Sequence, residues 1–244
     1  MRVIKLGGSL LDDAQRRAAA LKEIAAAWHA GEQIVLVHGG GKHIDANLAK
    51  LGIAKRTHGG LRVTDDVTLD VVVSVLAGTV NKWLVAELTA LGVKAAGISG
   101  SDASTLVADR HAPIDGVDLG HVGKVVASDP TLIRVILGQR ILPVVSSVAQ
   151  GPDGSLLNVN ADSAACAIAA GVRARSLQFI TDVAGLLDAN GAVVKRLTAD
   201  DAHAFLASDI VSGGMKPKLE AALHALAAGV RTIHIGGGTN LVAA

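Results

Sequence analysis

Residues 33–52, QIVLVHGGGKHIDANLAKLG, place an apolar run, three consecutive glycines and an amphipathic helical pattern one after the other. An unbroken run of Val, Ile and Leu is typical of a strand that is buried on both faces of a sheet. The helical pattern ends at Gly52, and glycine commonly terminates helices. The order strand, glycine turn, helix predicts a βα unit, and the rest of the chain repeats this order.

Short β-branched runs alternate with longer helical patterns along the whole sequence. We expect strands within residues 2–8, 33–41, 93–100, 141–148, 176–185 and 230–238. We expect helices over 13–29, 42–52, 65–91 (capped by Thr64 or Asp65), 130–137 and 161–171, and short hairpins between 102 and 126. This alternation predicts an α/β fold, a three-layer αβα sandwich with a central, mostly parallel sheet. The turn GPDGS, residues 151–155, predicts a boundary between an N-terminal lobe, 1–150, and a C-terminal lobe, 151–244.

The composition favours a large core of small and branched residues. Half of the 244 residues are hydrophobic, although the chain has only two Phe, two Trp and no Tyr. A balance of 23 basic and 22 acidic residues offers no electrostatic footprint for nucleic acid or an anionic membrane. The longest apolar stretches are interrupted by polar residues well short of a bilayer span. We expect Cys166, the single cysteine, to be a buried filler, so we predict no disulfide, no zinc site and a cytoplasmic location.

Glycine clusters at residues 7–8 and 39–41 follow the first two predicted strands. Glycine has no Cβ, so an anion can approach the backbone N–H groups and a helix N-terminus at such a cluster. Tight βα turns are the alternative explanation, but two clusters at successive strand ends favour an anion site. The spacing matches neither a P-loop, because His43 follows Lys42 where Ser or Thr would stand, nor the Gly-x-Gly-x-x-Gly of a dinucleotide fold. We interpret Lys42 as a solvated residue of the helix start.

Lysines stand at positions that the backbone alone does not favour. Lys5 lies in an apolar strand, which is costly unless its ammonium reaches a counter-charge, so it either extends to solvent or binds phosphate. Lys216 and Lys218 bracket Pro217 at the predicted start of the last helix, where the partial positive charge of a helix N-terminus disfavours cations. A bound anion would explain this pair. We choose Lys218 as the catalytic lysine and expect Lys216 to face solvent or a nucleotide phosphate.

Asp162 lies at the predicted start of another helix, in LNVNADSAA. A carboxylate is favoured there electrostatically, so Asp162 could simply be an N-terminal cap. Asn158 and Asn160 alternate on the segment that enters this helix and would point the same way. Two asparagines on one face beside an aspartate favour a polar site over turn chemistry.

Arg62 lies in GGLRVTDD, residues 59–66, close to two acidic side chains. It could pair with Asp65 or Asp66. Its planar guanidinium could also bind a carboxylate through two parallel hydrogen bonds. The residues alone leave both roles open.

Together these segments resemble the amino acid kinase family, and within it the acetylglutamate kinases. The resemblance runs in order over nearly the whole chain and rests on KLGGSLL, VHGGG, GLRVTDD, LAGTVNKWL, GISGSDA, LGHVGKV, LPVVSSVA, LNVNADSAA, TDVAGLLD and GGMKPKL. The glycine and lysine segments are shared across the whole family. The set GLRVTDD, NVNAD and GGMKPK is much more specific to the acetylglutamate kinases.

The resemblance implies ATP-dependent phosphorylation of the side-chain carboxylate of N-acetyl-L-glutamate, the second step of arginine biosynthesis. It implies that Lys5 and Lys218 stabilise the moving phosphoryl group and that Asp162 holds both lysines. It also implies a substrate-binding set and a nucleotide-binding set. The substrate set is Gly40, Gly41, Arg62 and Asn158. The nucleotide set is Gly7, Gly8, Thr181, Asp182, Val183, Ala184, Gly185, Leu186, Ile210, Val211, Ser212, Gly213, Gly214 and Met215.

The chemistry of this reaction agrees with such a site. Phosphoryl transfer needs in-line positioning and neutralised charge more than covalent help. A carboxylate is ionised at neutral pH, so no general base is required and no histidine is assigned a role. Because an anionic γ-phosphate must meet an anionic carboxylate, we expect flanking lysines and a Mg²⁺ ion bound through the nucleotide, without a metal site built by the protein.

The chain departs from the family pattern at both ends. It stops at IHIGGGTNLVAA, where family members usually continue with another helix and a final strand, so we expect a sheet edge that is exposed or covered differently. It begins almost directly at the first strand, without the helix that joins dimers of arginine-inhibited relatives into hexamers. We therefore expect an arginine-insensitive homodimer with the helix over 65–91 at its interface.

Three rival functions remain open from the sequence. A related kinase could form an acyl phosphate on carrier-bound aminoadipate or glutamate, and only the surroundings of Arg62 and Asn158 would distinguish it. A non-catalytic amino-acid or nucleotide sensor could use the same fold, but binding alone does not need Lys5, Asp162 and Lys218 together. An oxidoreductase is disfavoured because the dinucleotide fingerprint is missing.

Overall fold

The structure is a computed structural model that describes residues 1–181, 183–208, 210–211 and 213–243, apart from the side chain of Ser9. Within these residues an eight-stranded sheet forms the centre of the molecule. From one edge to the other its strands are β12 (Arg196–Thr198), β14 (Thr239–Val242), β13 (Thr232–Ile235), β11 (Ser176–Ile180), β1 (Arg2–Leu6), β2 (Ile34–His38), β8 (Leu142–Ser146) and β5 (Ala95–Ser99). The six strands from β13 to β5 are parallel, so their carboxyl ends lie at one edge.

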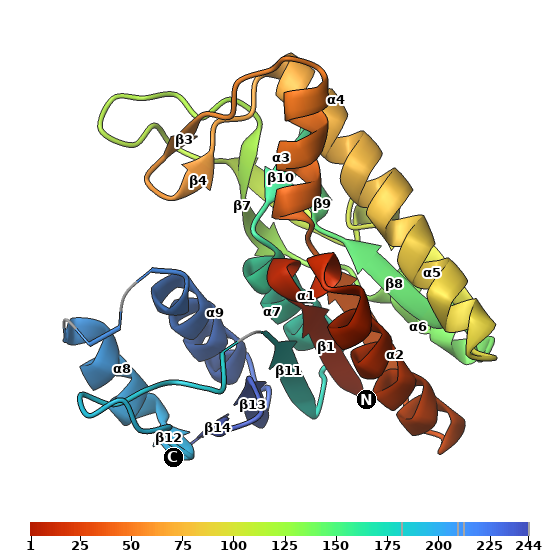
Figure 1. Cartoon of the computed structure of the whole chain (residues 1–244), viewed down its shortest axis with the longest axis vertical. Coiled ribbons are helices and arrows are strands. Elements are labelled where there is room, and N and C mark those ends of the chain that lie inside the picture. Colours follow the sequence, from red (N-terminus) through yellow and green to blue (C-terminus); the bar gives the residue numbers. More distant parts are fainter. Residues whose placement is uncertain (182, 209, 212, 244) are drawn as a thin grey trace.

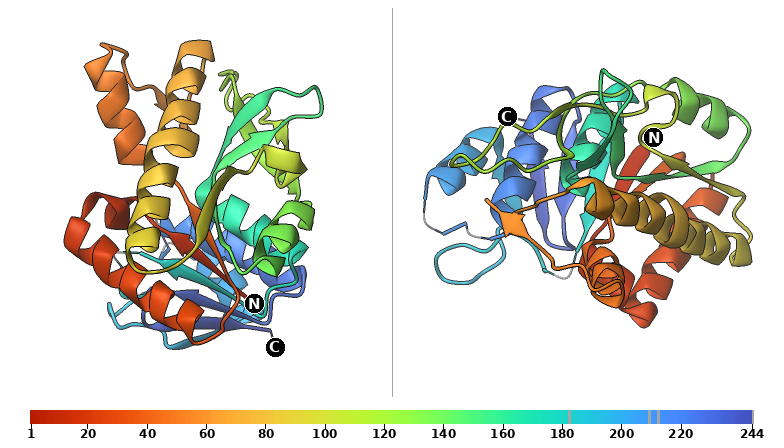
Figure 2. Two further views of the ribbon diagram at one scale, coloured as in Figure 1. Left: turned by 90° about the vertical axis from the view of Figure 1, so that its right-hand side faces the viewer. Right: turned by 90° about the horizontal axis from the view of Figure 1, so that it is seen from above.

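Helices cover both faces of this sheet. They are α1 (Gly8–Asp12), α2 (Ala14–His29), α3 (Gly41–Lys50), α4 (Asp66–Val73), α5 (Asn81–Ala90), α6 (Thr131–Gly138), α7 (Ala161–Gly171), α8 (Ala199–Ala207) and α9 (Met215–Ala227). Figure 2 shows α2 on one face, and α6 and α7 on the other. The expected three-layer, mostly parallel α/β fold is confirmed.

Polar side chains fix where several helices begin. The Asp13 side chain accepts hydrogen bonds from the N–H groups of Gln15 and Arg16, which separates α2 from the short α1 that the sequence analysis did not resolve. Asp65 accepts from the N–H of Thr68 and is therefore the cap of α4. Each such cap satisfies N–H groups that the first turn of a helix leaves without an intrahelical partner.

The predicted helix over 65–91 is continuous from α4 to α5 but contains a π-helical segment, Ser74–Val80. By length and hydropathy, the helical stretch from Asp66 to Ala90 could cross a bilayer. A core helix of a folded domain can have the same length and hydropathy. Val72, Leu84 and Leu88 of this helix are buried in the hydrophobic core.

A second, smaller sheet closes on itself as a four-stranded barrel in the part of the chain described. Its strands are β6 (Val107–Arg110), β7 (Val122–Ala127), β9 (Val148–Gln150) and β10 (Leu156–Val159). The antiparallel pair β6–β7 is the hairpin expected between 102 and 126. The strand predicted over 141–148 divides, with β8 in the large sheet and β9 in the barrel. The turn over 151–155 joins β9 to β10, and the lobe boundary near residue 150 stays a prediction.

Two strands that the sequence did not predict, β12 and β14, lie at one side of the sheet. After β13 the chain turns through Gly236–Gly238 and returns as β14, antiparallel to β13 and parallel to β12. Residues 239–242 therefore occupy a strand position inside the sheet, and β12 forms the edge. The sequence predicts no strand here, because TNLV is too short and too weakly patterned to be recognised without its partners.

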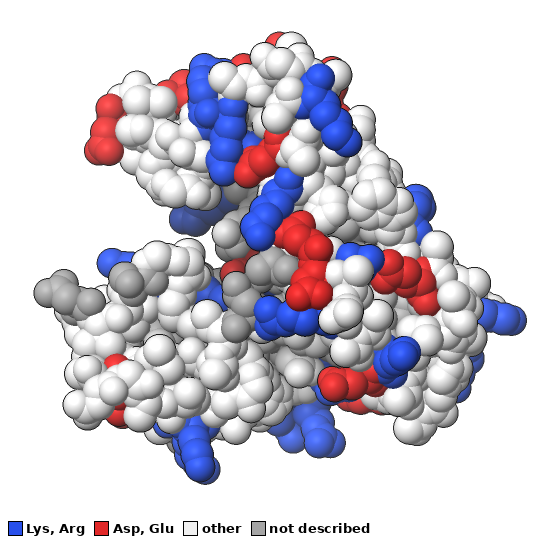
Figure 3. Space-filling model, viewed as in Figure 1, with Lys and Arg blue, Asp and Glu red and all other residues white. Residues whose placement is uncertain are grey.

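The elements form two halves with a cleft between them. One half carries α3, α4, the barrel and the hairpin of β3 (Thr57–His58) and β4 (Leu61–Arg62), and the other carries α8, α9 and β11–β14 (Figure 1). Figure 3 shows the cleft as a deep notch with Lys and Arg side chains on both walls. The carboxyl ends of the central strands point to this cleft, where ligands of open α/β sheets are usually bound.

Candidate active site

Lys5, Asp162 and Lys218 meet at the carboxyl edge of the central strands. The Nζ of Lys5 lies 2.8 Å from Oδ1 of Asp162, and the Nζ of Lys218 lies 2.8 Å from Oδ2 of the same carboxylate. All three residues are buried, with exposed fractions of 8%, 9% and 7%. One carboxylate thus aligns two ammonium groups that come from opposite ends of the chain.

Three elements bring these side chains together. Lys5 comes from β1, Asp162 from the first turn of α7, and Lys218 from the first turn of α9. Asn160 is the N-cap of α7, because its side chain accepts hydrogen bonds from the N–H groups of Asp162 and Ser163. Asp162 itself is therefore not the cap, and its carboxylate is available to the lysines.

The last helix begins earlier than the sequence analysis predicted. α9 starts at Met215, which makes Pro217 its third residue. Proline is tolerated there because the first four N–H groups of a helix have no intrahelical partner. Lys216 is exposed, whereas Lys218 is buried and its Nζ lies 4.9 Å from the centroid of the Phe179 ring. The two lysines of the motif therefore have different environments, and Asp162 offsets the charge of only one.

The charge of Asp162 is stabilised by its neighbours. Burial raises the pKa of this carboxyl, but the charges of Lys5 and Lys218 and their hydrogen bonds outweigh burial, so the pKa of Asp162 lies below its ordinary value. The carboxylate stays ionised at neutral pH. The cluster carries one negative and two positive charges, so it attracts a further anion.

The two glycine clusters lie beside these charged groups. The N–H of Gly7 donates to the carbonyl of Ile180 at 2.9 Å, so the first cluster adjoins the end of β11. At Gly40 a Cβ would lie 2.9 Å from Cδ2 of Leu76, too close for any other residue without a shift of that side chain. Around Gly8 and Gly41 an added Cβ would meet nothing within 4 Å, so the backbone there is open.

Arg62 pairs with a residue that the sequence analysis did not identify. Its Nη2 lies 2.5 Å from Oδ1 of Asp45 and 3.2 Å from the carbonyl of Gly41. The alternative pairing with Asp65 or Asp66 is wrong, because Asp65 pairs with Arg56 and Asp66 with His121. Among the described residues, Nη1 of Arg62 is buried without a hydrogen-bond partner. A guanidinium with a free buried nitrogen is suited to a carboxylate ligand.

A cavity of about 260 Å³ joins several of the predicted residues. It is lined by Lys5, Gly8, Gly39, Gly40, Gly41, Ile44, Gly60, Leu61, Arg62, Leu76, Val122, Ser147, Asn158, Val159, Asn160, Ala161 and Asp162. The side chain of Asn158 donates to Oγ1 of Thr64 at 3.1 Å and faces this cavity. The residues predicted to be catalytic and those predicted to bind substrate thus share one cavity, apart from Lys218, which contacts Asp162 of its lining.

The predicted nucleotide segments are the loop after β11 and the loop before α9. Asp182 and Ser212 lie outside the described residues. Leu186 is buried and its N–H donates to Oγ1 of Thr239 at 2.8 Å, while the side chains of Val183 and Ile210 are 42% and 45% exposed. A Cβ on Gly7 would lie 3.6 Å from Cα of Thr181, so the loop after β11 contacts the first glycine cluster. The remaining residues of the predicted nucleotide-binding set lie in these two loops, at Ala184, Gly185, Val211, Gly213 and Gly214, and at the first residue of α9, Met215.

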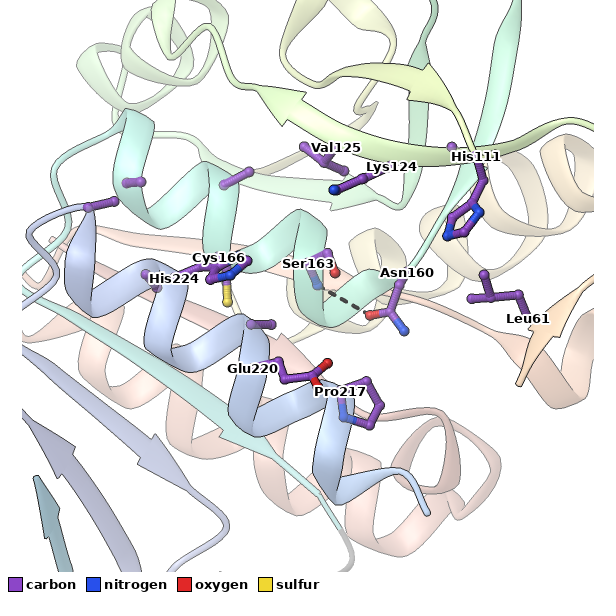
Figure 4. A pocket seen from close by; sticks show the side chains of 16 residues that line it. Leu61, His111, Lys124, Val125, Asn160, Ser163, Cys166, Pro217, Glu220 and His224 are labelled. Atoms are coloured by element: carbon purple, nitrogen blue, oxygen red, sulfur yellow. Dashed lines mark hydrogen bonds between the residues drawn. The ribbon is translucent and has the colours of Figure 1, made fainter. Parts of the chain in front are cut away.

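A larger cavity of about 490 Å³ adjoins this site (Figure 4). Figure 4 shows it between α7 and α9 on one side and the barrel residues Lys124 and Val125 on the other. Its helical walls consist mainly of small residues, and the buried thiol of Cys166, whose pKa burial raises, forms part of them. Leu61 and Asn160 line both cavities, so both belong to the cleft between the two halves.

The functional features that the sequence analysis missed are long-range contacts. Asp45 precedes Arg62 by 17 positions, and the two meet only because the β3–β4 hairpin brings Arg62 to α3. An acidic residue four positions after the last glycine of the second cluster was the available signal. Among the described residues, no group of three or more His, Cys, Asp and Glu is arranged to hold a metal ion.

Comparison with known proteins concerns the fold and the family of the chain. The family model described as "Amino acid kinase family" matches residues 1–237. The acetylglutamate kinase of Rhizobium leguminosarum bv. trifolii is 41% identical over 97% of this chain and 83% of its own length. The crystal structure of smu.665 from Streptococcus mutans has a TM-score of 0.86 and 30% identity, covering 99% of this chain and 98% of that one.

The fold is also that of a region of N-acetylglutamate synthase from Neisseria gonorrhoeae. This structure has a TM-score of 0.86 and 23% identity, and it covers 99% of this chain but only 59% of that one. At this identity the similarity concerns the fold alone. The sequence match over nearly the whole chain is what identifies the family. The chain belongs to the amino acid kinase family.

Proposed function

We propose that the chain transfers the γ-phosphoryl group of ATP to the side-chain carboxylate of N-acetyl-L-glutamate, giving N-acetyl-L-glutamyl 5-phosphate and ADP. A bond forms between a carboxylate oxygen and the γ-phosphorus, and the bond to the β,γ-bridging oxygen breaks. The observation that carries the proposal is the Asp162 carboxylate with one lysine at 2.8 Å from each oxygen. The relatives at about 40% identity, which are acetylglutamate kinases, support this substrate and a place in arginine biosynthesis.

Lys5 and Lys218 are the proposed catalytic cations. Negative charge spreads over the oxygens of the moving phosphoryl group, and two fixed ammonium groups stabilise it without reorganisation during the reaction. Asp162 is the proposed organiser. It keeps the two lysines, which repel each other, in one place before the phosphates arrive, and its lowered pKa keeps it ionised for this role.

The acceptor site is proposed on the opposite wall of the cavity. Arg62, held by Asp45, offers its free Nη1 to the α-carboxylate end of the substrate. Asn158 is proposed to bind the same end. Gly40 and Gly41 present open backbone to the acyl group and the phosphoryl group. This arrangement would direct the side-chain carboxylate toward Lys5.

The nucleotide is proposed to lie along Gly7 and Gly8, residues 181–186 and residues 210–215. The first of these loops contacts Gly7, and the second leads directly into the helix that carries Lys218. Mg²⁺ would be bound mainly through the phosphates, since the described residues contain no cluster of three or more metal-binding side chains. A cytoplasmic location is part of the same proposal.

A homodimer through the long helix is also proposed. Val67 and Trp83 on this helix, and Leu51 at the end of α3, are 58%, 51% and 64% exposed. These exposed apolar side chains would be removed from water if another chain covered this helix. Light scattering should give twice the mass of one chain, and a monomer at micromolar concentration would contradict this part of the proposal.

The test of the function is acyl-phosphate trapping. Purified chain with ATP, Mg²⁺ and hydroxylamine should form a hydroxamate from N-acetyl-L-glutamate faster than from L-glutamate or L-aspartate, and EDTA should abolish it. Preference for free glutamate or for a carrier-bound acid would mean that the chain is a related acyl-phosphate-forming kinase with a different substrate. Formation of no hydroxamate from any of these acids would contradict the kinase function.

A further inference from the structure

The second glycine cluster depends on contacts with other segments for a fixed backbone conformation. Gly39 and Gly40 lie between β2 and α3, and Gly41 is the first residue of α3; the three glycines are here called the glycine loop. Glycine loses more conformational freedom on ordering than any other residue. A segment of three glycines that is proposed to bind a substrate through its backbone therefore needs constraints from its surroundings. Two sets of contacts from the long helix supply them.

The first set is a hydrogen-bond chain through His38, the last residue of β2. The ring is fully buried, with its Nδ1 2.9 Å from the carbonyl of Gly39 and its Nε2 3.1 Å from Nδ2 of Asn81. A carbonyl can only accept, so Nδ1 carries the proton, and Nε2 accepts from the Asn81 amide. Burial lowers the pKa of His38 from 6.5 to about 4, so the ring is neutral at pH 7 and the tautomer is fixed.

Asn81 is itself rigidly held. It is fully buried, and its Nδ2 also lies 2.9 Å from the carbonyl of Val144 and 3.3 Å from that of Ile98, so its two N–H groups are shared between these carbonyls and His38. A Cβ at position 97 would lie 1.8 Å from Oδ1 of Asn81, so only glycine at that position leaves room for the amide. The chain Asn81–His38–Gly39 thus connects two further strands, β8 and β5, to the glycine loop.

The second set comes from the π-helical segment that ends one residue before Asn81. A Cβ added to Gly40 would lie 2.9 Å from Cδ2 of Leu76 and 3.4 Å from Cγ2 of Val80. Both side chains belong to the segment Ser74–Val80 and pack against the loop at Gly40. π-helical turns inside longer helices are frequently found at functional sites. This one faces the loop at the point where the proposed substrates meet.

We propose that His38 and Asn81, with Leu76 and Val80, form a positioning device that fixes the glycine loop for phosphoryl transfer. None of the four needs to touch the phosphoryl group. They act through the loop backbone, which lies against the start of α7, since a Cβ on Gly39 would lie 3.1 Å from Cβ of Ala161. The catalytic part of this inference rests on the proposed function, whereas the restraint on the loop does not.

Two substitutions of one residue separate positioning from stability. His38→Phe removes both hydrogen bonds, whereas the amide of His38→Gln can still accept from Asn81. A misplaced reacting group costs up to about 100-fold in rate, so we expect kcat per folded molecule to fall about 10- to 100-fold in His38→Phe, with KM for ATP within about twofold. His38→Gln should recover part of this loss. Thr105→Val, which removes a side-chain hydrogen bond from a fully buried residue outside the loop, is the control and should keep wild-type kcat.

A second measurement does not depend on the substrate. Hydrogen exchange of the full chain, followed by mass spectrometry, should be faster over residues 38–44 in His38→Phe than in wild type, and unchanged there in Thr105→Val. If His38→Phe keeps the wild-type kcat and the wild-type exchange, the inference is wrong. If wild type has no kinase activity, the proposed function is wrong, and the exchange result alone decides whether the loop is restrained.

If His38→Phe does not fold, the tautomer of His38 in the wild-type chain still tests the inference. Ring ¹⁵N NMR of the wild-type chain at pH 7 should show a neutral His38 with its proton on Nδ1. A charged ring, or a proton on Nε2, would overturn the hydrogen-bond chain and with it the inference.

Discussion

Replacing Lys218 by alanine removes one of the two ammonium groups that we place on the moving phosphoryl group. The loss of one preorganised charge donor costs about 3 kcal/mol in transition-state stabilisation. Since about 1.4 kcal/mol corresponds to a tenfold change in rate, we expect kcat to fall about 100- to 200-fold. The KM for ATP should change only a few-fold, because Lys5, the glycine clusters and the two nucleotide loops remain.

The structure offers a matched control two residues away. Lys216 belongs to the same first turn of α9 but is exposed, whereas Lys218 is 7% exposed and 2.8 Å from Asp162. Lys216→Ala removes the same charge from the same helix end and should lower kcat less than about fivefold, since screened surface charges contribute little. In Lys218→Ala the Asp162 carboxylate keeps its partner Lys5, so the variant should remain folded.

Both variants are measured by hydroxamate formation, with saturating N-acetyl-L-glutamate and varied MgATP. Circular dichroism and urea unfolding check that the molecules compared are folded. Equal losses of kcat in the two variants would mean that the helix end, and not the buried lysine, provides the charge. A large rise in the KM for ATP with unchanged kcat in Lys218→Ala would make Lys218 a binding residue only, and the catalytic reasoning would be refuted.

Further predictions concern Asp162, Arg62 and His38. Asp162→Asn leaves two buried lysines without their counter-charge, so the free energy of unfolding should fall by about 3 kcal/mol or more, and kcat should fall as well. An unchanged free energy of unfolding in urea would contradict the ion pairs of Asp162 with the two lysines. Arg62→Lys keeps the charge but loses the planar fork, so KM for N-acetyl-L-glutamate should rise at least about tenfold while KM for ATP stays constant, and the opposite pattern would place Arg62 at the nucleotide. The pKa of His38 is lowered from 6.5 to about 4 in the folded chain. Between these pH values the unfolded chain therefore binds more protons than the folded chain. As the pH falls through this range, His38 lowers the free energy of unfolding by up to about 3 kcal/mol. Urea unfolding between pH 7 and pH 4 should therefore show a shallower pH dependence for His38→Gln than for wild type, and identical slopes would contradict the buried neutral ring.

The sequence predicts the six parallel strands of the central sheet because each is a mostly apolar, β-branched run, and the first two end at glycine clusters. Helix α7 begins at Ala161 and ends at Gly171, as its pattern predicts, and Asp65 caps the long helix. The meeting of Lys5, Asp162 and Lys218 was expected from the family resemblance, and the ion pairs of the structure agree with it. No rule of local spacing alone would have brought residues 5 and 218 together.

What the sequence does not predict depends on contacts between distant segments. The partner of Arg62 is Asp45 because the β3–β4 hairpin brings Arg62 to α3, whereas the acidic residues nearest in sequence pair elsewhere. The strand β14 exists because it can pair with both β13 and β12. The π-helical segment of the long helix has no signature in the hydrophobic pattern and is recognised only by its contact with Gly40.

The most direct test of the account is a crystal structure of the chain with MgADP, aluminium fluoride and N-acetyl-L-glutamate. Aluminium fluoride imitates the phosphoryl group between donor and acceptor. The account predicts that Nζ of both Lys5 and Lys218 lies within hydrogen-bonding distance, about 3 Å, of the fluoride ligands, with Asp162 still between them. A fluoride group bound out of reach of either lysine would contradict the claim that the two cations act on one transferring group.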